Sequence, residues 1–143
     1  MPERARGYAH RVDIGAALDD VWQALLDPKL LAQWYGVGAR IDRREGGSYW
    51  IRVGEDLVRE AHIDVYRPPN RLRLIYMPLA ELPDEGVVVD DFLIDQAHDD
   101  APVVLRLLGS GIPENRAWDP MYVRLRVGWE RALIRLKALL EQP

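Results

Sequence analysis

At 143 residues, with 48% hydrophobic and 29% charged side chains, the chain has the size and composition of one soluble globular domain with a single core. It has no cysteine, which excludes disulfides, thiolate zinc sites and a cysteine nucleophile and fits a reducing cytoplasm. The net charge is −4 and the arginines are scattered among acids, so we expect no nucleic-acid-binding face. No apolar run approaches the ~20 residues of a membrane span, so we expect no membrane span. The charged N-terminus lacks the apolar segment of a secretory signal, so we expect no export.

The first part of the chain predicts one strand followed by two short helices. Residues 8–16 alternate loosely between apolar and polar side chains, which is typical of a strand. Residues 18–27 carry their apolar side chains on one side of a helix. Asp27 and Pro28 then combine a capping side chain with a proline at the first helical position, and they predict a second helix that ends at Gly36.

Residues 38–108 follow a period of two, which is typical of strands with one buried face. Glycines and prolines divide this region into about six strands with short turns, so the strands should form an antiparallel meander. The predicted strands are 39–43, 49–53, 60–66, 71–76, 87–94 and 103–108, and residues 77–86 and 109–117 are expected to be loops.

Residues 119–142 predict one long amphipathic helix. Its apolar residues recur at steps of three and four, and they include Tyr122 and Trp129. Asp119 and Pro120 mark the start, as a cap and as the first helical residue. The helix would be ~33 Å long, and an apolar stripe of that length needs a broad apolar partner. The sequence therefore predicts an α+β fold in which this helix lies across a strongly curved antiparallel sheet.

Gly128 interrupts the predicted long helix. A glycine in a helix interior costs ~1 kcal/mol relative to alanine, so its presence asks for a reason. Two interpretations stay open. The missing side chain lets a strand or a ligand come close, or the glycine is simply tolerated beside a packed Trp129.

Short motifs stand in a fixed order along nearly the whole chain. They are Val21-Trp22-Gln23-Ala24-Leu25, Trp34-Tyr35-Gly36, Gly46-Gly47-Ser48-Tyr49, Pro68-Pro69-Asn70-Arg71-Leu72, Ser110-Gly111-Ile112-Pro113 and Gly128-Trp129. This set resembles the START-like (SRPBCC, birch-pollen-allergen-like) superfamily, and more narrowly the C-terminal domain of the activators of the heat-shock protein 90 ATPase and their bacterial homologues. The resemblance implies a helix-grip fold in one domain, residues 1–143. The chain departs from the family at Val37, where proline is usual, and at Gly109, where histidine is usual.

Two groups of side chains are candidate sites of chemistry. One strand face carries Glu60, His62 and Asp64, whose side chains are of the types that bind metals. Neighbouring positions on one face of a strand lie ~7 Å apart, so these side chains converge poorly on one ion. We therefore expect this face to be exposed to solvent, with no metal and no cofactor. Ser48 and Ser110 stand in turn-like glycine contexts without a nucleophile elbow. No catalytic residue is assigned.

Asp90 interrupts an apolar strand. If Val88 and Phe92 face the core, the period of two places Asp90 there as well, where a carboxylate could bind a polar ligand group or act as acid or base. If Val87 and Val89 point inward instead, Asp91 takes that role. A bulge, or exposure at a strand end, would leave neither carboxylate inside.

The leading function from these patterns is binding of a small apolar molecule, lipid- or polyketide-like, in a cavity between the sheet and the long helix. The runner-up is a cyclase- or hydrolase-type enzyme that uses the same cavity, which an inward ionisable cluster would favour. The expected ligand-binding residues are Trp34, Tyr49, Ile51, Leu74, Tyr76, Asp90, Phe92, Leu105, Leu107, Tyr122, Gly128 and Trp129.

A third hypothesis is a co-chaperone-like module that binds a protein partner. It ranks last because the eukaryotic activators of the resembling family carry a separate N-terminal domain that this sequence does not contain. Trp50 bears on partners too, because it alternates with Tyr49 and Ile51 and should point outward. An exposed tryptophan needs cover, so we expect either a weak homodimer or a contact between Trp50 and residues 81–95.

Overall fold

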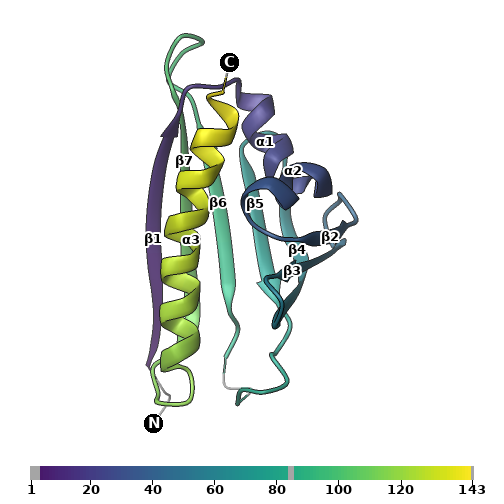
Figure 1. The fold of residues 1–143 in the computed structure, drawn as a ribbon, viewed down its shortest axis with the longest axis vertical. Coiled ribbons are helices and arrows are strands. Elements are labelled where there is room, and N and C mark those ends of the chain that lie inside the picture. The colour runs from purple at the N-terminus through teal and green to yellow at the C-terminus, as the bar shows by residue number, and fades with distance from the viewer. Residues whose placement is uncertain (1–3, 84–85, 143) are drawn as a thin grey trace.

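A curved antiparallel sheet and one long helix form the body of the protein. The computed structural model describes residues 4–83 and 86–142 (Figure 1). The elements are β1 (Ala5–Ile14), α1 (Leu18–Leu26), α2 (Pro28–Trp34), β2 (Gly38–Ile41), β3 (Ser48–Val53), β4 (Leu57–Arg67), β5 (Arg71–Tyr76), β6 (Val89–Asp95), β7 (Val103–Pro113) and α3 (Asp119–Leu140). Among the described helices, none is both long enough and apolar enough to cross a membrane.

The sheet has seven strands in the order β1-β7-β6-β5-β4-β3-β2, and every neighbouring pair is antiparallel. Strands β2 to β7 form the predicted meander, and β1 closes it by pairing with β7. Because β1 and β2 lie at opposite edges, the chain has to cross the molecule between them. The helices α1 and α2 make that crossing and pack beside the C-terminal half of α3 (Figure 1). The predicted fold class and element order are confirmed.

The long helix covers the concave face of the sheet. Its buried residues recur every three or four positions and form the stripe that the sequence predicts: Leu125, Trp129, Ala132, Leu133 and Leu136. The predicted cap is wrong, because Trp118 occupies the cap position and Asp119 is already helical. Asp119 instead pairs with Arg6 on β1, over 2.6 Å.

The predicted loop at residues 109–117 is wrong in its first half, because β7 continues to Pro113. Tyr8 is the partner of Gly109 across β1 and β7. A Cβ atom on Gly109 would lie 2.3 Å from the ring of Tyr8. The glycine therefore lets an aromatic ring lie flat on the strand, and it does not mark a turn.

Trp50 lies on the outer face of β3, as predicted. Its side chain is half-buried and not fully exposed, because another side chain packs on its ring. The guanidinium of Arg40, from β2, lies 4.5 Å from the centre of its ring. The predicted contact with residues 81–95 is wrong for the part in β6, because β4 and β5 separate β6 from β3. A homodimer through this face stays a prediction.

Candidate functional site

A cluster of hydrogen-bonding side chains surrounds Asp90 in the middle of the core. Asp90 is fully buried, so of the two possible orientations of β6 the structure has the one that turns Asp90 inward. Its carboxylate accepts hydrogen bonds from the Tyr8 hydroxyl, the Tyr76 hydroxyl (2.8 Å), Arg59 Nη1 (3.2 Å) and Trp129 Nε1 (3.2 Å). These donors come from β1, β5, β4 and α3, so the carboxylate ties the helix to three other strands of the sheet.

Arg59 provides the positive charge of this cluster. It lies on β4 between the buried residues Leu57 and Ala61, and its side chain is 3% exposed. The guanidinium carbon lies 3.7 Å from the centre of the Tyr76 ring, and Nη1 also donates to the Tyr35 hydroxyl over 3.3 Å. A buried charge of this kind is tolerated because it is paired and hydrogen-bonded.

The tyrosines around this pair remain protonated at neutral pH. Burial, reinforced by the charge of Asp90, raises the pKa of Tyr8. Burial also raises the pKa values of Tyr35 and Tyr76, although Arg59 opposes the shift in both. Burial by itself lowers the pKa of Arg59, but the surrounding oxygens more than offset it, so the guanidinium keeps its proton. Tyr8 and Tyr76 therefore donate hydrogen bonds to Asp90, Tyr35 accepts one from Arg59, and none of the three acts as a base near neutral pH.

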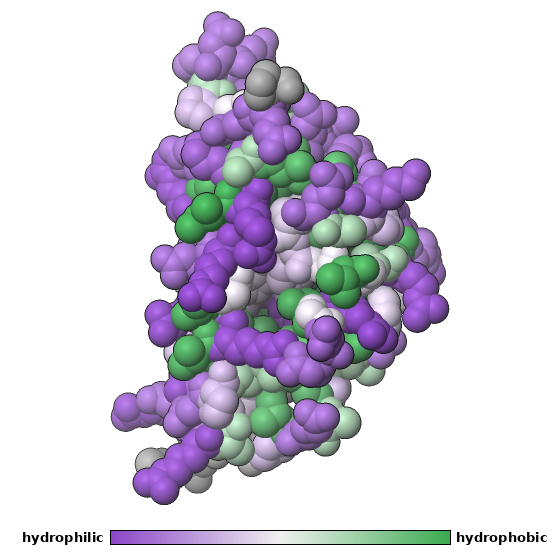
Figure 2. Space-filling view, viewed as in Figure 1, coloured by the Kyte–Doolittle hydropathy of each residue, from purple (hydrophilic) through white to green (hydrophobic). Residues whose placement is uncertain are grey.

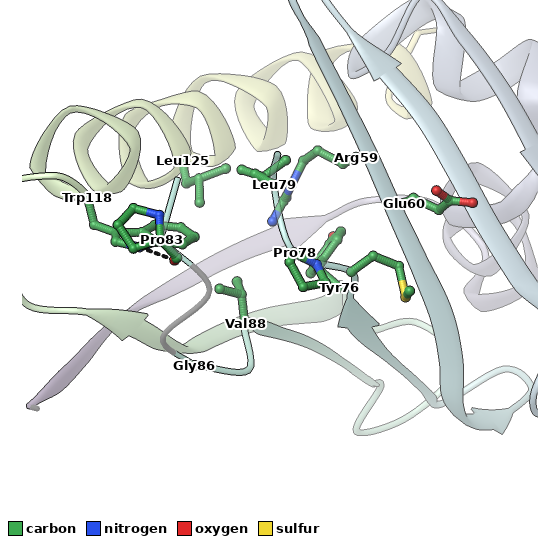
Figure 3. A pocket seen from close by; sticks show the side chains of 11 residues that line it. Arg59, Glu60, Tyr76, Pro78, Leu79, Pro83, Gly86, Val88, Trp118 and Leu125 are labelled. Carbon is green, nitrogen blue, oxygen red and sulfur yellow. Dashed lines mark hydrogen bonds between the residues drawn. The ribbon is translucent and has the colours of Figure 1, made fainter. Parts of the chain in front are cut away.

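A pocket opens over Arg59, and we call it the Arg59 pocket. It lies between the ends of β4 and β5, the start of α3 and the segment 77–83 (Figure 3). Trp118 Nε1 donates to the Pro83 carbonyl over 3.1 Å, which holds this segment against the helix. The pocket is lined by Arg59, Glu60, Tyr76, Met77, Pro78, Leu79, Pro83, Gly86, Val88, Trp118 and Leu125.

The Arg59 pocket is mainly apolar and narrow. Its cavity volume is about 20 Å³, and the wider space of about 440 Å³ around it is partly open to solvent. In Figure 3 the Arg59 side chain reaches into the space beside Leu79 and Tyr76, whereas Glu60 points away from the other lining residues. The buried polar end of the pocket is thus a guanidinium.

A second hollow lies beside the middle of α3, where Figure 2 shows a recess with apolar residues at its edge. It holds about 350 Å³ of empty space, again partly open to solvent. A Cβ atom on Gly128 would meet nothing within 4 Å, so no strand comes close to this glycine, and its contact with a ligand stays a prediction. We call this the Gly128 hollow, and it is lined by Tyr35, Val53, Leu57, Arg124, Leu125, Gly128 and Trp129.

The structure divides the expected ligand-binding residues into three groups. Tyr76 lines the Arg59 pocket, Gly128 and Trp129 line the Gly128 hollow, and Asp90 lies behind both. Tyr122 lies against β1, where its hydroxyl donates to the Gly7 carbonyl over 2.8 Å. The remaining residues are packed in the hydrophobic core: Trp34, Tyr49, Ile51, Leu74, Phe92, Leu105 and Leu107.

The expected position of the cavity therefore needs correction. Apart from the half-buried Tyr76, the inward row from Tyr49 to Leu107 is at most 3% exposed, because the side chains of the sheet and of α3 fill the space between them. The two hollows described here lie beside that row, toward segment 77–83 and the first half of α3.

Sequence reasoning missed Arg59, Tyr8 and Tyr35 as members of the site. A signal for Arg59 was present: the period of two that places Ala61 inward also places Arg59 inward, two residues earlier. Tyr8 lies on the inward side of the first strand, but its approach to Asp90 depends on Gly109. No pattern in the sequence brings Tyr35 to Arg59.

The helix wrapped by a curved antiparallel sheet places the protein in the SRPBCC superfamily, with its helix-grip fold. The chain matches the family described as Activator of Hsp90 ATPase homolog 1-like protein over residues 16–141, and it belongs to that family. No curated protein matches the chain in sequence.

Solved structures share the fold over nearly the whole chain. CalU16 from Micromonospora echinospora is 25% identical with a TM-score of 0.73, covering 98% of this chain and 83% of its own. Protein MLL2253 from Mesorhizobium loti is 20% identical with a TM-score of 0.80, covering 95% and 97%. The Aha1 dimer from Colwellia psychrerythraea is 16% identical with a TM-score of 0.75, covering 95% and 96%. At 20% identity or below, the likeness is one of fold.

Proposed function

We propose that this protein binds a small, mainly apolar molecule in the Arg59 pocket. The observation that carries the proposal is the composition of its walls: the apolar side chains of Leu79, Val88 and Leu125 surround a space whose inner end is the guanidinium of Arg59. Ligand sites of globular proteins commonly combine such apolar walls with a few fixed polar groups.

The narrowness of the pocket implies that a ligand has to move side chains at its mouth. Met77 is 52% exposed and Leu79 is half-buried, so both can turn outward at small cost in packing. The inner wall is different, because Val88 and Leu125 belong to the core and Arg59 is fixed by two hydrogen bonds. The ligand would therefore enter past segment 77–83 and reach a preformed inner end.

Binding is favoured over catalysis by the state of the inward ionisable groups. The cluster exists, as the enzyme hypothesis requires, but Asp90 accepts four hydrogen bonds and its charge is paired with Arg59. The nearby tyrosines have raised pKa values and keep their protons. The cluster thus has no free group that would take a proton from a substrate near neutral pH.

A cytoplasmic location and a homodimer belong to the same proposal. The first rests on the absence of cysteine, which fits a reducing compartment. The second rests on the dimer of the Colwellia psychrerythraea relative and on the outward position of Trp50.

An apolar dye that becomes fluorescent in dry cavities tests the binding proposal. We expect the native protein to bind the dye and Leu79→Trp to lose it, because the larger ring fills the Arg59 pocket from an exposed segment. Gly128→Leu is the matched control: it fills the neighbouring hollow and should leave binding intact. Loss of dye binding in Gly128→Leu but not in Leu79→Trp would show that the site lies under the helix and not in the Arg59 pocket. A native protein that binds no dye would refute the proposal.

A further inference from the structure

We propose that the Arg59 pocket selects an uncharged apolar molecule with one carbonyl-type hydrogen-bond acceptor. The free N–H groups of Arg59 bind this acceptor, and Asp90 makes the pocket reject carboxylates. This inference rests on the proposed function and names its ligand class.

The unused donors of Arg59 supply the acceptor site. A guanidinium carries five N–H groups. Both hydrogen bonds of Arg59 are made by Nη1, to Asp90 and to Tyr35, and within residues 4–83 and 86–142 neither Nε nor Nη2 has a hydrogen-bond partner. The guanidinium lines the pocket at its buried end, so three N–H groups remain for a ligand.

The other inward donors are already in use. The hydroxyl of Tyr76 donates to Asp90 over 2.8 Å, and Trp129 Nε1 donates to the same oxygen over 3.2 Å. Trp118 lines the pocket wall, but its Nε1 donates to the Pro83 carbonyl. A polar ligand group that enters the pocket would therefore meet Arg59 as its main donor.

Charge decides between a carbonyl and a carboxylate. Arg59 lies 3.2 Å from Asp90, so the pair has no net charge, and the one other charged lining residue among those described is Glu60, an acid. On the rim of the Gly128 hollow, Arg124 forms an ion pair with Asp56 over 2.7 Å, so its charge is also paired. A carboxylate would lose its hydration without gaining an unpaired positive charge, whereas a carbonyl accepts the same hydrogen bond at a much smaller cost of desolvation.

The walls define the rest of the ligand. Leu79, Val88 and Leu125 offer apolar contact, and the ring of Trp118 adds a flat surface. Together with the single acceptor site, they suit an aromatic or alicyclic ketone, ester or amide of modest size.

Three probes with the same ring system test the inference: 2-ethylnaphthalene, 2-acetylnaphthalene and 2-naphthoate, titrated into the wild-type protein at pH 7 by calorimetry. A net hydrogen bond to a charged group corresponds to roughly tenfold or more in affinity, so we expect the ketone to bind about tenfold more tightly than the hydrocarbon, and the carboxylate no more tightly than the hydrocarbon. Equal affinity of ketone and hydrocarbon, or tightest binding of the carboxylate, would overturn the inference while leaving the proposed function. If none of the three binds, both fail.

Variants of the ion pair test the role of Asp90. Asp90→Asn leaves the charge of Arg59 unpaired, so the affinity for 2-naphthoate should rise at least tenfold relative to the affinity for the ketone. An unchanged ratio of the two affinities would contradict the role of Asp90. The double variant Arg59→Met with Asp90→Asn removes both charges and should bind ketone and hydrocarbon equally. If Asp90→Asn does not fold, the affinities of the three probes for the wild type and for the double variant still test the inference. A double variant that keeps the tenfold preference for the ketone over the hydrocarbon would overturn it.

Discussion

Trp129 donates a hydrogen bond from its indole Nε1 to Asp90, over 3.2 Å, and this bond joins the long helix to the centre of the sheet. The same indole stacks on Tyr35, with ring centres 4.1 Å apart, and meets the edge of Phe92. One side chain of α3 therefore combines apolar packing with a polar contact to the buried ion pair. Because such a contact is lost if the helix shifts by a residue, it fixes the register of α3 on the sheet.

Replacement of Trp129 should measure how much this anchor contributes to stability. We expect Trp129→Ala to lower the free energy of unfolding by ~3–5 kcal/mol, as for other buried tryptophans. Trp129→Phe keeps an aromatic ring and loses the N–H donor, so it should cost less, although it leaves one acceptor position of Asp90 empty. Urea denaturation would give both values, and a loss under ~1 kcal/mol for Trp129→Ala would contradict the packing described here.

Gly109 should be intolerant of any side chain. Its Cβ atom would lie 2.3 Å from Cζ of Tyr8, so Gly109→Ala forces the ring away from the strand and from Asp90. We expect a loss of ~1–3 kcal/mol, from overpacking and a broken hydrogen bond. Gly38→Ala is the matched control, because a Cβ atom on this β2 glycine meets nothing within 4 Å. Equal thermal melting of the two variants would show that Tyr8 does not need the glycine.

The buried tyrosines should make the protein sensitive to alkali. Burial raises the pKa values of Tyr8, Tyr35, Tyr49 and Tyr76 above the ordinary value of about 10. Below pH 10 these groups are protonated in both states and stability is unaffected. Above it, the unfolded chain releases protons that the folded chain keeps, so the free energy of unfolding should fall by ~1.4 kcal/mol per pH unit for each tyrosine that stays protonated.

Urea denaturation at pH 8, 10 and 11 would measure this slope. Tyr76→Phe removes one of the titrating groups and should make the slope shallower, which separates the tyrosine effect from that of other groups. A free energy of unfolding that stays constant between pH 10 and 11 would show that the tyrosines are not held protonated by the fold.

Association through the outer face of the sheet is tested by Trp50. Arg40 already covers the ring, so little apolar area is left for a second chain and any homodimer should be weak. We expect wild-type protein to sediment faster as its concentration rises and Trp50→Lys to remain monomeric. Identical monomeric sedimentation of both proteins would remove the homodimer through this face.

Periodicity predicted the fold and part of the site, because it determines which side of a strand each residue faces. It left two orientations of this strand open, and the structure has the one in which Asp90 faces inward together with Phe92. The same rule applied to β4 from Leu57 would have placed Arg59 inward. The predicted strand begins at Glu60, after the turn predicted at Gly54, and therefore leaves out Arg59, the charged partner of Asp90.

The position of the cavity could not be predicted in the same way, since periodicity gives faces and not volumes. The inward row that includes Leu74 and Leu105 is filled by the side chains of α3. What remains open depends on segment 77–83 and on the angle at which α3 crosses the sheet, and neither has a repeating pattern.

The central claim is that the Arg59 pocket binds a small apolar molecule, and side-chain N–H signals in ¹H–¹⁵N NMR spectra test it most directly. The chain has five tryptophans, of which Trp118 lines the pocket, while Trp22 is buried in α1. On titration with 2-ethylnaphthalene, the indole signal of Trp118 and the Nε signal of Arg59 should shift together and saturate, while the indole signal of Trp22 stays in place. Unchanged Trp118 and Arg59 signals at saturating probe would contradict the claim.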